Sequence, residues 1–314
     1  MGVPACLPGA GQRPQASQRR WMEYPNVTLT RRPAARTPQT AALIGLLSLL
    51  AAACATAPET VGPPRAETVY AVTDAADLIR FNAGQPQIVQ ARLPLQGLAA
   101  GDRLVGIDFR VARGVLYALS ATGRLYTLDT STARLSPVGS AAPIVLTGQH
   151  IGFDFNPAAD RIRVVSDSGM NLRLHPDTGA LAATDPALAR APGQSGAPLR
   201  VAGAGYTYNK TNDKLTTNYA IDLAAGALVT QGTTEGVQPA VSPNTGQIFV
   251  VGALGTGALD DAAFDIADTH NAAPAALRSG GRTRLHLVDL ATGRATLLGS
   301  VGDGRALWGM AIAP

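Results

Sequence analysis

The sequence predicts an all-β protein, most simply a β-propeller with five blades of about four strands each. Two observations predict this fold. A hairpin turn recurs five times, and short strands with alternating apolar residues surround each copy. The glycine or alanine that closes each turn stands at positions 84, 133, 179, 226 and 293, which are 49, 46, 47 and 67 residues apart. Four short strands repeated at a period near 45 residues are typical of propeller blades.

The recurring turn explains one set of acidic residues. Its copies read LDTSTA, HPDTGA, IDLAAG and VDLATG, with a shorter version, FNAG, near the N-terminus. An Asp or Asn at the start of such a turn bonds the backbone that follows it, and glycine supplies the positive φ. We therefore interpret Asp129, Asp222 and Asp289 as hairpin residues and not as ligands.

The strands of each repeat can be assigned in order. Each hairpin is preceded by a strand with alternating apolar residues, such as RLYTLD or RLHLVD. A second apolar strand lies upstream of it, as in TVYAVTD, VLYALSA, RIRVVSD and QIFVVGA. A further pattern, expected nearest the propeller axis, reads VGIDFRV, IGFDFNP, VQPAVSP (237–243) and WGMAIAP, with AGAGYTYN (202–209) as a degenerate copy. The C-terminal copy has no strands after it, and the first repeat has none before it. We expect residues 307–314 to join residues 68–92 and close the first blade, which removes a free sheet edge.

An acidic insert, residues 255–281, lengthens the last repeat. It contains Asp260, Asp261, Asp265 and Asp268. Carboxylates can ligate Ca²⁺, but the alternating ligands, central glycine and closing Glu of an EF-hand loop are missing. The spacing of three and four residues favours the exposed face of a short helix, with Leu259, Ala263 and Phe264 beneath it.

The N-terminal region has the pattern of an export signal. An apolar run at residues 42–53 follows three arginines, precedes Cys54, and is too short to span a bilayer. Its AAAC ending resembles a bacterial lipoprotein signal, in which the Cys becomes the lipidated first residue; the alternative is an ordinary cleaved signal that contains a Cys. Met22 is a natural start, so residues 1–21 need not be translated. The predicted domains are a signal region (1–53), a tether (54–66) and a propeller-like domain (67–314).

This signal determines the expected location and charge of the protein. We expect an exported cell-envelope lipoprotein, on the outer membrane or the periplasmic side, attached to the membrane through a lipid on Cys54. The whole chain has 26 Lys and Arg against 22 Asp and Glu, and residues 1–53 hold six Arg and one Glu. The remaining 20 basic and 21 acidic residues carry no basic excess, so we expect no nucleic acid partner.

Charged side chains inside the predicted strands are the candidate site. They are Asp108, Arg110, Asp154, Asn156, Asp160, Arg161, Arg163, Asn171 and Arg173. A charge between propeller blades is costly unless it is paired and hydrogen-bonded. One interpretation is a structural network between blades, with Asp108 paired to Arg110 and Asp154 and Asp160 to Arg161 and Arg163. The other is a polar channel mouth that holds a polar ligand.

Long stretches of the chain resemble a bacterial family called domain of unknown function 4394. The resemblance is carried by GFDFNPAADRIRVVSDSGMNLRLHPDTGAL, by LVGIDFRVARGVLYALSATGRLYTLD and by the later FDI, residues 264–266. It runs from about Thr68 to the C-terminus, and the third repeat departs most from it. The resemblance implies a secreted or surface-attached propeller-like domain. It implies no activity and no catalytic residues.

Catalytic signatures are missing from the sequence. It contains no G-x-S-x-G, S-x-x-K, H-E-x-x-H, C-x-x-C or P-loop motif. The four histidines lack the spacing of metal ligands, so we expect no cofactor and no metal site. The first hypothesis is a non-enzymatic, envelope-anchored propeller that binds a polar ligand or a protein or polysaccharide partner. The alternative is a hydrolase or lyase acting on cell-wall or sugar material, with its site at the channel mouth near Asp154 and Arg163.

Overall fold

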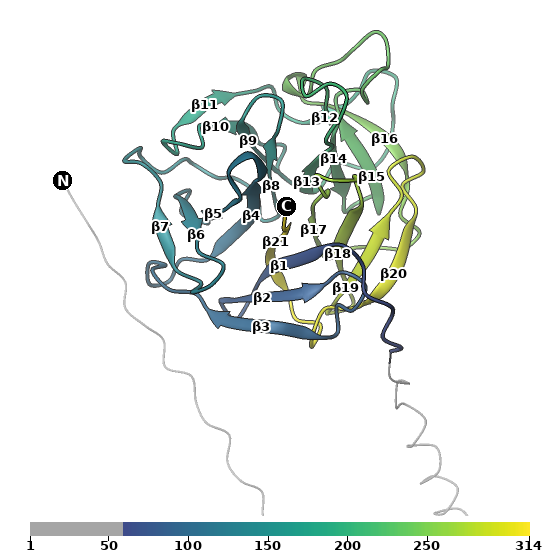
Figure 1. Ribbon diagram of the computed structural model, residues 1–314. Helices are drawn as coiled ribbons and strands as arrows, with labels where there is room; N and C mark the ends of the chain where they lie inside the picture. Colours follow the sequence, from purple (N-terminus) through teal and green to yellow (C-terminus); the bar gives the residue numbers. More distant parts are fainter. Residues whose placement is uncertain (1–58) are drawn as a thin grey trace, which may run out of the picture. The chain divides into compact units, whose positions relative to one another are not determined.

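The computed structural model describes residues 59–314, which form a five-bladed β-propeller as the sequence predicts (Figure 1). The signal region and Cys54 lie outside the described residues. Blades are numbered here in chain order. Blade 1 contains β1 (Thr68–Thr73), β2 (Asp77–Asn82), β3 (Val89–Pro94) and β21 (Leu307–Ile312); blade 2 contains β4 (Leu104–Arg110), β5 (Val115–Ser120), β6 (Leu125–Leu128) and β7 (Leu135–Pro137); blade 3 contains β8 (Ile151–Asn156), β9 (Arg161–Ser166), β10 (Asn171–Leu174) and β11 (Leu181–Thr184).

The last two blades follow the same plan with small variations. Blade 4 contains β13 (Val201–Tyr206), β14 (Asn218–Asp222), β15 (Ala227–Gln231), β16 (Gln247–Ala253) and the short β12 (Ala189–Arg190); blade 5 contains β17 (Asp261–Phe264), β18 (Ala273–Ser279), β19 (Arg282–Val288) and β20 (Ala295–Ser300). Two 3₁₀ turns, η1 (Val111–Arg113) and η2 (Pro243–Thr245), lie in the connections. No helix in the described part of the chain is long and apolar enough to cross a membrane.

The ring is closed as the sequence predicts. β21 pairs antiparallel with β1, and Ile312 lies opposite Val69. The last strand of the chain is therefore the inner strand of the first blade, and Figure 1 shows the C-terminus near the centre of the ring. This pairing gives blade 1 its fourth strand and covers the inner edge of β1.

Two strand assignments from the sequence are wrong. Residues 237–243 do not form an inner strand, and β16, read as the second strand of blade 5, is the outer strand of blade 4, paired with β15. The inner strand of blade 5 is β17, inside the acidic insert, where a helix was expected. Phe264 occupies the inward apolar position that the repeat requires, and pairing with β18 outweighs the helical spacing of the aspartates.

The five inner strands, β4, β8, β13, β17 and β21, pack side by side around the axis, and this close packing needs small residues. A Cβ on Gly309 of β21 would lie 2.8 Å from the backbone nitrogen of Ile107 in β4. A Cβ on Gly106 would lie 2.4 Å from the Cβ of Phe153 in β8. The glycines of the repeated pattern therefore set how closely the inner strands approach.

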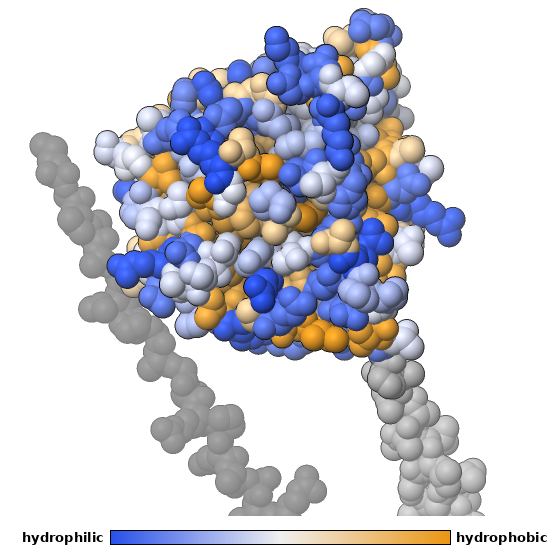
Figure 2. Space-filling view, in the orientation of Figure 1, coloured by the Kyte–Doolittle hydropathy of each residue, from blue (hydrophilic) through white to orange (hydrophobic). Residues whose placement is uncertain are grey.

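Apolar side chains fill the space between blades. At the interface of blades 2 and 3, for example, the rings of Tyr117 and Phe155 meet edge to face with centroids 5.1 Å apart, packed with Leu119 and Val164. Figure 2 shows apolar residues between hydrophilic ones near the middle of the visible face, whereas the loops that project from its edge are hydrophilic.

The residues before β1 lie against the propeller. The Glu59 carboxylate accepts hydrogen bonds from the backbone N–H of Ser300 at 2.6 Å and from its hydroxyl at 2.7 Å. The backbone N–H of Arg65 donates to Asn82 Oδ1 at 2.8 Å. The described part of the expected tether thus contacts blades 5 and 1. The division into a signal region, a tether and a propeller-like domain stays a prediction.

Candidate functional site

One aspartate position recurs in the inner strands β4 and β8 and directly after β17, and it gathers three carboxylates at the axis. It is occupied by Asp108 in blade 2, Asp154 in blade 3 and Asp265 in blade 5, and by Gly205 and Ala311 in the other two. All three aspartates are buried, and an oxygen of each lies within 4.8 Å of the others.

Each of these carboxylates joins its own blade to the next one. Asp108 accepts the backbone N–H of Phe155 at 2.7 Å, Asp154 that of Tyr206 at 2.8 Å, and Asp265 that of Ile312 at 2.6 Å. The acceptor satisfies an inner-strand N–H that no further strand can reach, and a buried N–H without a partner is costly. We call these three aspartates the axial latches. Their first role is structural.

The electrostatics of the axial latches is unusual. Burial, together with the negative charge of Asp265, raises the pKa of Asp108 well above the ordinary value. Burial and the charges of Asp108 and Asp265 do the same for the pKa of Asp154. Burial also raises the pKa of Asp265 to about 7, against the opposing effect of its backbone hydrogen bonds. Three carboxylates this close do not all ionise unaided. Chemically, they can share protons, or their oxygens can hold a hard cation.

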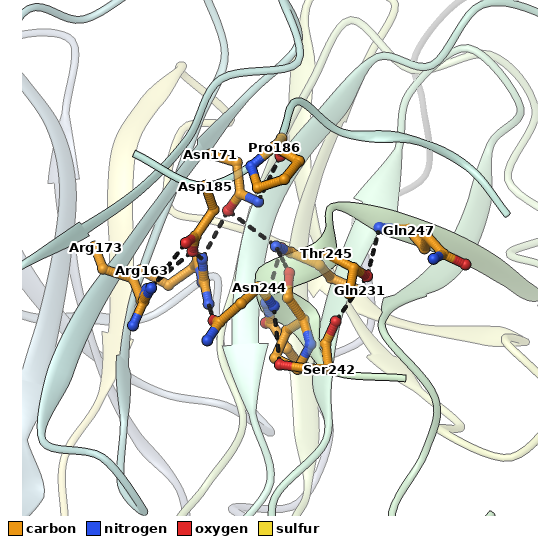
Figure 3. A network of polar contacts seen from close by, with 12 residues as sticks. Arg163, Asn171, Arg173, Asp185, Pro186, Gln231, Ser242, Asn244, Thr245 and Gln247 are labelled. Atoms are coloured by element: carbon orange, nitrogen blue, oxygen red, sulfur yellow. Dashed lines mark hydrogen bonds and ion pairs between the residues drawn. The ribbon is translucent and has the colours of Figure 1, made fainter. Parts of the chain in front are cut away.

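Arg163 carries the densest polar network of the site (Figure 3). Its guanidinium, on β9, is almost completely buried and donates to Asp185, Asn171 and Asn244 at 2.6–2.7 Å. It also donates to the Tyr206 hydroxyl at 3.2 Å. Arg173 holds both oxygens of the same Asp185, at 2.8 and 2.9 Å. Because Asn244 and Tyr206 belong to blade 4, the network joins blades 3 and 4.

Arg110 makes the corresponding connection between blades 2 and 3. It forms ion pairs with Asp160 and with Asp177, two carboxylates of the blade 3 turns. The expected pairing of Asp108 with Arg110 is wrong, because Asp108 turns to the axis and bonds backbone groups instead. The expected pairing of Asp154 or Asp160 with Arg163 is also wrong, because Asp185 is the acid that balances Arg163.

A basic cavity lies beside this network. Its volume is about 350 Å³, and four of its lining residues are basic while none is acidic. The basic residues are Arg161, Arg163, Arg173 and Lys214; Asn156, Tyr206, Thr216 and Asn244 are among the others. Four of the five guanidinium N–H groups of Arg163 already have protein acceptors. Lys214 is exposed, and within residues 59–314 it has no ion-pair partner.

A second cavity of about 460 Å³ adjoins the basic one, because Asn156 lines both. Its walls include Val111, Phe155 and Tyr208. Burial and the charges of the axial latches raise the pKa of the Tyr208 phenol, so this hydroxyl stays protonated. The candidate residues Asn156, Arg161, Arg163 and Arg173 thus come together at the first cavity, and Arg110 and Asp160 lie at the second.

Sequence reasoning missed several residues of the site. Asp177 lies in the HPDTGA turn and Asp185 directly follows β11, and only the folded blades show which arginine each one meets. Asp265 was assigned to an exposed helix face, although FDI matches the FDF of Asp154 and could have revealed it. His150 bonds Asp261 at 2.7 Å across the ring, from blade 3 to blade 5, which no local spacing predicts.

No curated protein matches the sequence. Among solved structures, a proposed 6-phosphogluconolactonase from Bacteroides uniformis is 14% identical, with a TM-score of 0.40, over 76% of this chain and 83% of that one. The Myxococcus xanthus glutaminyl cyclase is 13% identical, with a TM-score of 0.42, over 73% and 97%.

A protein of unknown function from Bacteroides thetaiotaomicron is 10% identical, with a TM-score of 0.44, over 74% of this chain and 64% of that one. Similarities at this level carry no argument about function. The family comparison is more specific, because the model of DUF4394, a domain of unknown function, matches residues 77–311, almost the whole propeller. The chain therefore belongs to the DUF4394 family.

Proposed function

We propose that this protein is an exported, lipid-anchored, non-enzymatic propeller that binds an anionic polar ligand in the basic cavity. One observation carries the proposal: four basic side chains and no acidic one line this cavity. Asp185 balances only part of this charge, since it pairs with Arg163 and Arg173. Arg161 and Lys214 have no carboxylate partner among the described ion pairs, and they supply the attraction for an anion.

The groups around the cavity also suit an anion in their hydrogen bonding. Arg163 and Arg173 are fixed by Asp185, so their positions cost little further ordering when a ligand binds. Asn244 offers its amide N–H groups, since its oxygen accepts from Arg163. Planar guanidinium groups match carboxylate and phosphate oxygens in geometry. The ligand expected here carries a carboxylate or a phosphate.

A thermal-shift experiment tests the binding. The full chain is exported with Cys54→Ser so that it stays soluble, and phosphate, citrate and glucuronate are compared with uncharged glucose. A ligand at 100 times its Kd stabilises the fold by about 2.7 kcal/mol. For a domain of this size that raises the Tm by roughly 5 °C or more.

Matched variants locate the ligand. Lys214→Ala and Arg161→Ala should each abolish or strongly reduce the shift while the protein without ligand melts as before. Arg134→Ala, which removes the same charge from an exposed hairpin of blade 2, should leave the shift intact. If all three variants lose the thermal shift equally, the anions respond to the net charge of the protein and not to this cavity, which would contradict the proposal. The absence of a shift with any anion would also reject it.

The export part of the proposal has its own test. Cells that express the full chain are fed a palmitate analogue with a chemical tag, and the labelled protein is followed in membrane fractions. Labelling and membrane retention that Cys54→Ser abolishes would support the anchor. Secretion of an unlabelled, cleaved chain from the unaltered sequence would reject it and leave an ordinary signal.

One observation favours an enzyme as the second candidate. A carboxyl group with a pKa near 7, as at Asp265, suits general acid catalysis in a hydrolase or lyase. Against this, both Asp265 oxygens already accept backbone N–H groups and the side chain is only 6% exposed. Incubation with cell-wall fragments and acidic oligosaccharides, followed by mass analysis, would reveal turnover. Activity that Asp265→Asn abolishes in a folded protein would favour the enzyme.

A further inference from the structure

The two cavities differ in character although they share a wall. The first is lined by basic residues, as described above. In the second, Arg110 is neutralised by Asp160 and the other basic residue, Arg113, is exposed. The other lining residues include the buried ring of Phe155, the Tyr208 ring, Pro157 and Val111. The second cavity therefore offers apolar and aromatic surface where the first offers positive charge. A ring or short aliphatic group buried there leaves water favourably.

Asn156 stands between the cavities in a fixed position. Its Oδ1 accepts the backbone N–H groups of Ala158 at 2.9 Å and Ala159 at 3.0 Å, which holds the turn that follows β8. With the oxygen occupied in this way, the Asn156 amide N–H groups are available to a ligand that passes from one cavity to the other. Tyr208 lines the apolar side, and its hydroxyl, protonated as described above, is a second hydrogen-bond donor.

We infer that the two cavities form one bipartite site, and that its ligand is an organic anion that carries an uncharged ring or apolar group. The anionic end lies among Arg161, Arg173 and Lys214, and the apolar part lies against Phe155 and Tyr208. This inference rests on the proposed anion binding and specifies the class of ligand. A ligand that fills both parts gains affinity from each without a second loss of translational freedom.

Calorimetry with a graded series of small molecules tests this inference. The probes are ω-phenylalkanoates with one to five methylene groups, each compared with the unbranched alkanoate of equal chain length and with the corresponding phenyl alcohol. The soluble Cys54→Ser chain is used throughout. At the best chain length the phenylalkanoate should bind at least tenfold more tightly than either partner, because only this molecule reaches both cavities.

Two variants separate the parts of the site. Ala112→Trp places a large side chain at the exposed rim of the second cavity, and it should remove the advantage of the ring while alkanoate binding persists. Ala100→Trp, on an exposed loop outside both cavities, is the matched control and should change nothing. Lys214→Ala should weaken the phenylalkanoate and the alkanoate alike.

Methyl NMR supplies an independent reading. Phenylalkanoates should shift the Val111 methyl signals, and alkanoates should not. If the ring adds no affinity at any chain length and the Val111 signals stay in place, the bipartite site is rejected while anion binding stands. If no anion binds at all, both proposals fall together.

Discussion

At the scale of single residues, the Asp154 side chain both stabilises the fold through a hydrogen bond and destabilises it through charge repulsion. Its Oδ2 accepts the Tyr206 N–H and so joins blades 3 and 4. Its charge lies close to Asp108 and Asp265, and burial together with these neighbours raises its pKa. When the pKa of a carboxyl group in the folded state exceeds its unfolded value of about 4, the group stays protonated and neutral up to a higher pH in the folded state. The resulting penalty develops as pH rises from about 4 through the folded pKa and is absent below that range.

This reasoning gives opposite predictions for two substitutions. Asp154→Asn keeps an oxygen for the Tyr206 N–H and removes one charge, so we expect it to be neutral or stabilising at pH 8 and less favourable at pH 5. Asp154→Ala leaves the N–H without an acceptor and should cost about 1–3 kcal/mol at both pH values. Denaturant unfolding at pH 5 and pH 8 measures both. An Asn variant that is equally destabilised at both pH values would contradict the picture of a charged cluster.

The two interblade arginines should differ in their effect on stability. Removing Arg163 leaves Asp185 buried, with only Arg173 to balance it, and disrupting a buried ion pair typically costs about 3–5 kcal/mol. Removing Arg110 leaves Asp160 and Asp177, whose side chains are 52% and 58% exposed and can be solvated. We therefore expect Arg163→Ala to lower the free energy of unfolding clearly more than Arg110→Ala. Urea unfolding measures these differences, and the control Arg134→Ala should leave the free energy of unfolding unchanged. Equal losses of stability in Arg163→Ala and Arg110→Ala would contradict this prediction.

At the scale of elements, the repeated hairpins could be predicted because their signals are local. An Asp that accepts the backbone N–H groups two and three residues further on, as Asp129 and Asp289 do, requires no distant partner. The inner strand β17 could not be predicted from spacing, since the pairing with β18 that makes it a strand involves residues beyond the acidic run. The same holds for the site, where Arg163 could be selected from the sequence but its acid, Asp185, could not.

The inner strand β21 provides a test of how tightly the ring is closed. A methyl group at Gly309 would meet the backbone of β4, at Ile107 and Gly106, rather than a movable side chain. Crowding of this kind typically costs about 1–3 kcal/mol, so Gly309→Ala should lower the Tm of the whole domain. Gly280→Asn is a suitable control, because position 280 has a positive φ that Asn tolerates and open space around its Cβ. Comparable losses in both variants would show that β21 is not sterically constrained.

At the scale of the whole molecule, three of the five blades contribute an axial latch and two do not. Asp108, Asp154 and Asp265 each join one blade to the next, whereas Gly205 and Ala311 hold this position in blades 4 and 1. Blade 4 is joined to blade 5 by other means, through two hydrogen bonds between Asn271 and the Tyr208 backbone. The small residues let the inner strands approach, and the carboxylates satisfy the N–H groups that this approach leaves without a strand partner.

The contact between His150 and Asp261 joins blade 3 directly to blade 5. It should make the stability of the fold depend on pH. The Asp261 carboxylate raises the pKa of His150, against burial and the nearby Arg200, with Asp167 adding to the rise. A raised histidine pKa contributes stability that is present below the unfolded value of about 6.5 and is lost as pH rises through the folded value. We expect His150→Gln to cost roughly 1 kcal/mol at pH 5.5 and less at pH 8.5, as for a partly exposed pair. Thermal unfolding at the two pH values measures this, with Asp261→Asn expected to give the same pattern. A cost that is larger at pH 8.5 would mean that neutral His150, and not its charge, holds blades 3 and 5 together.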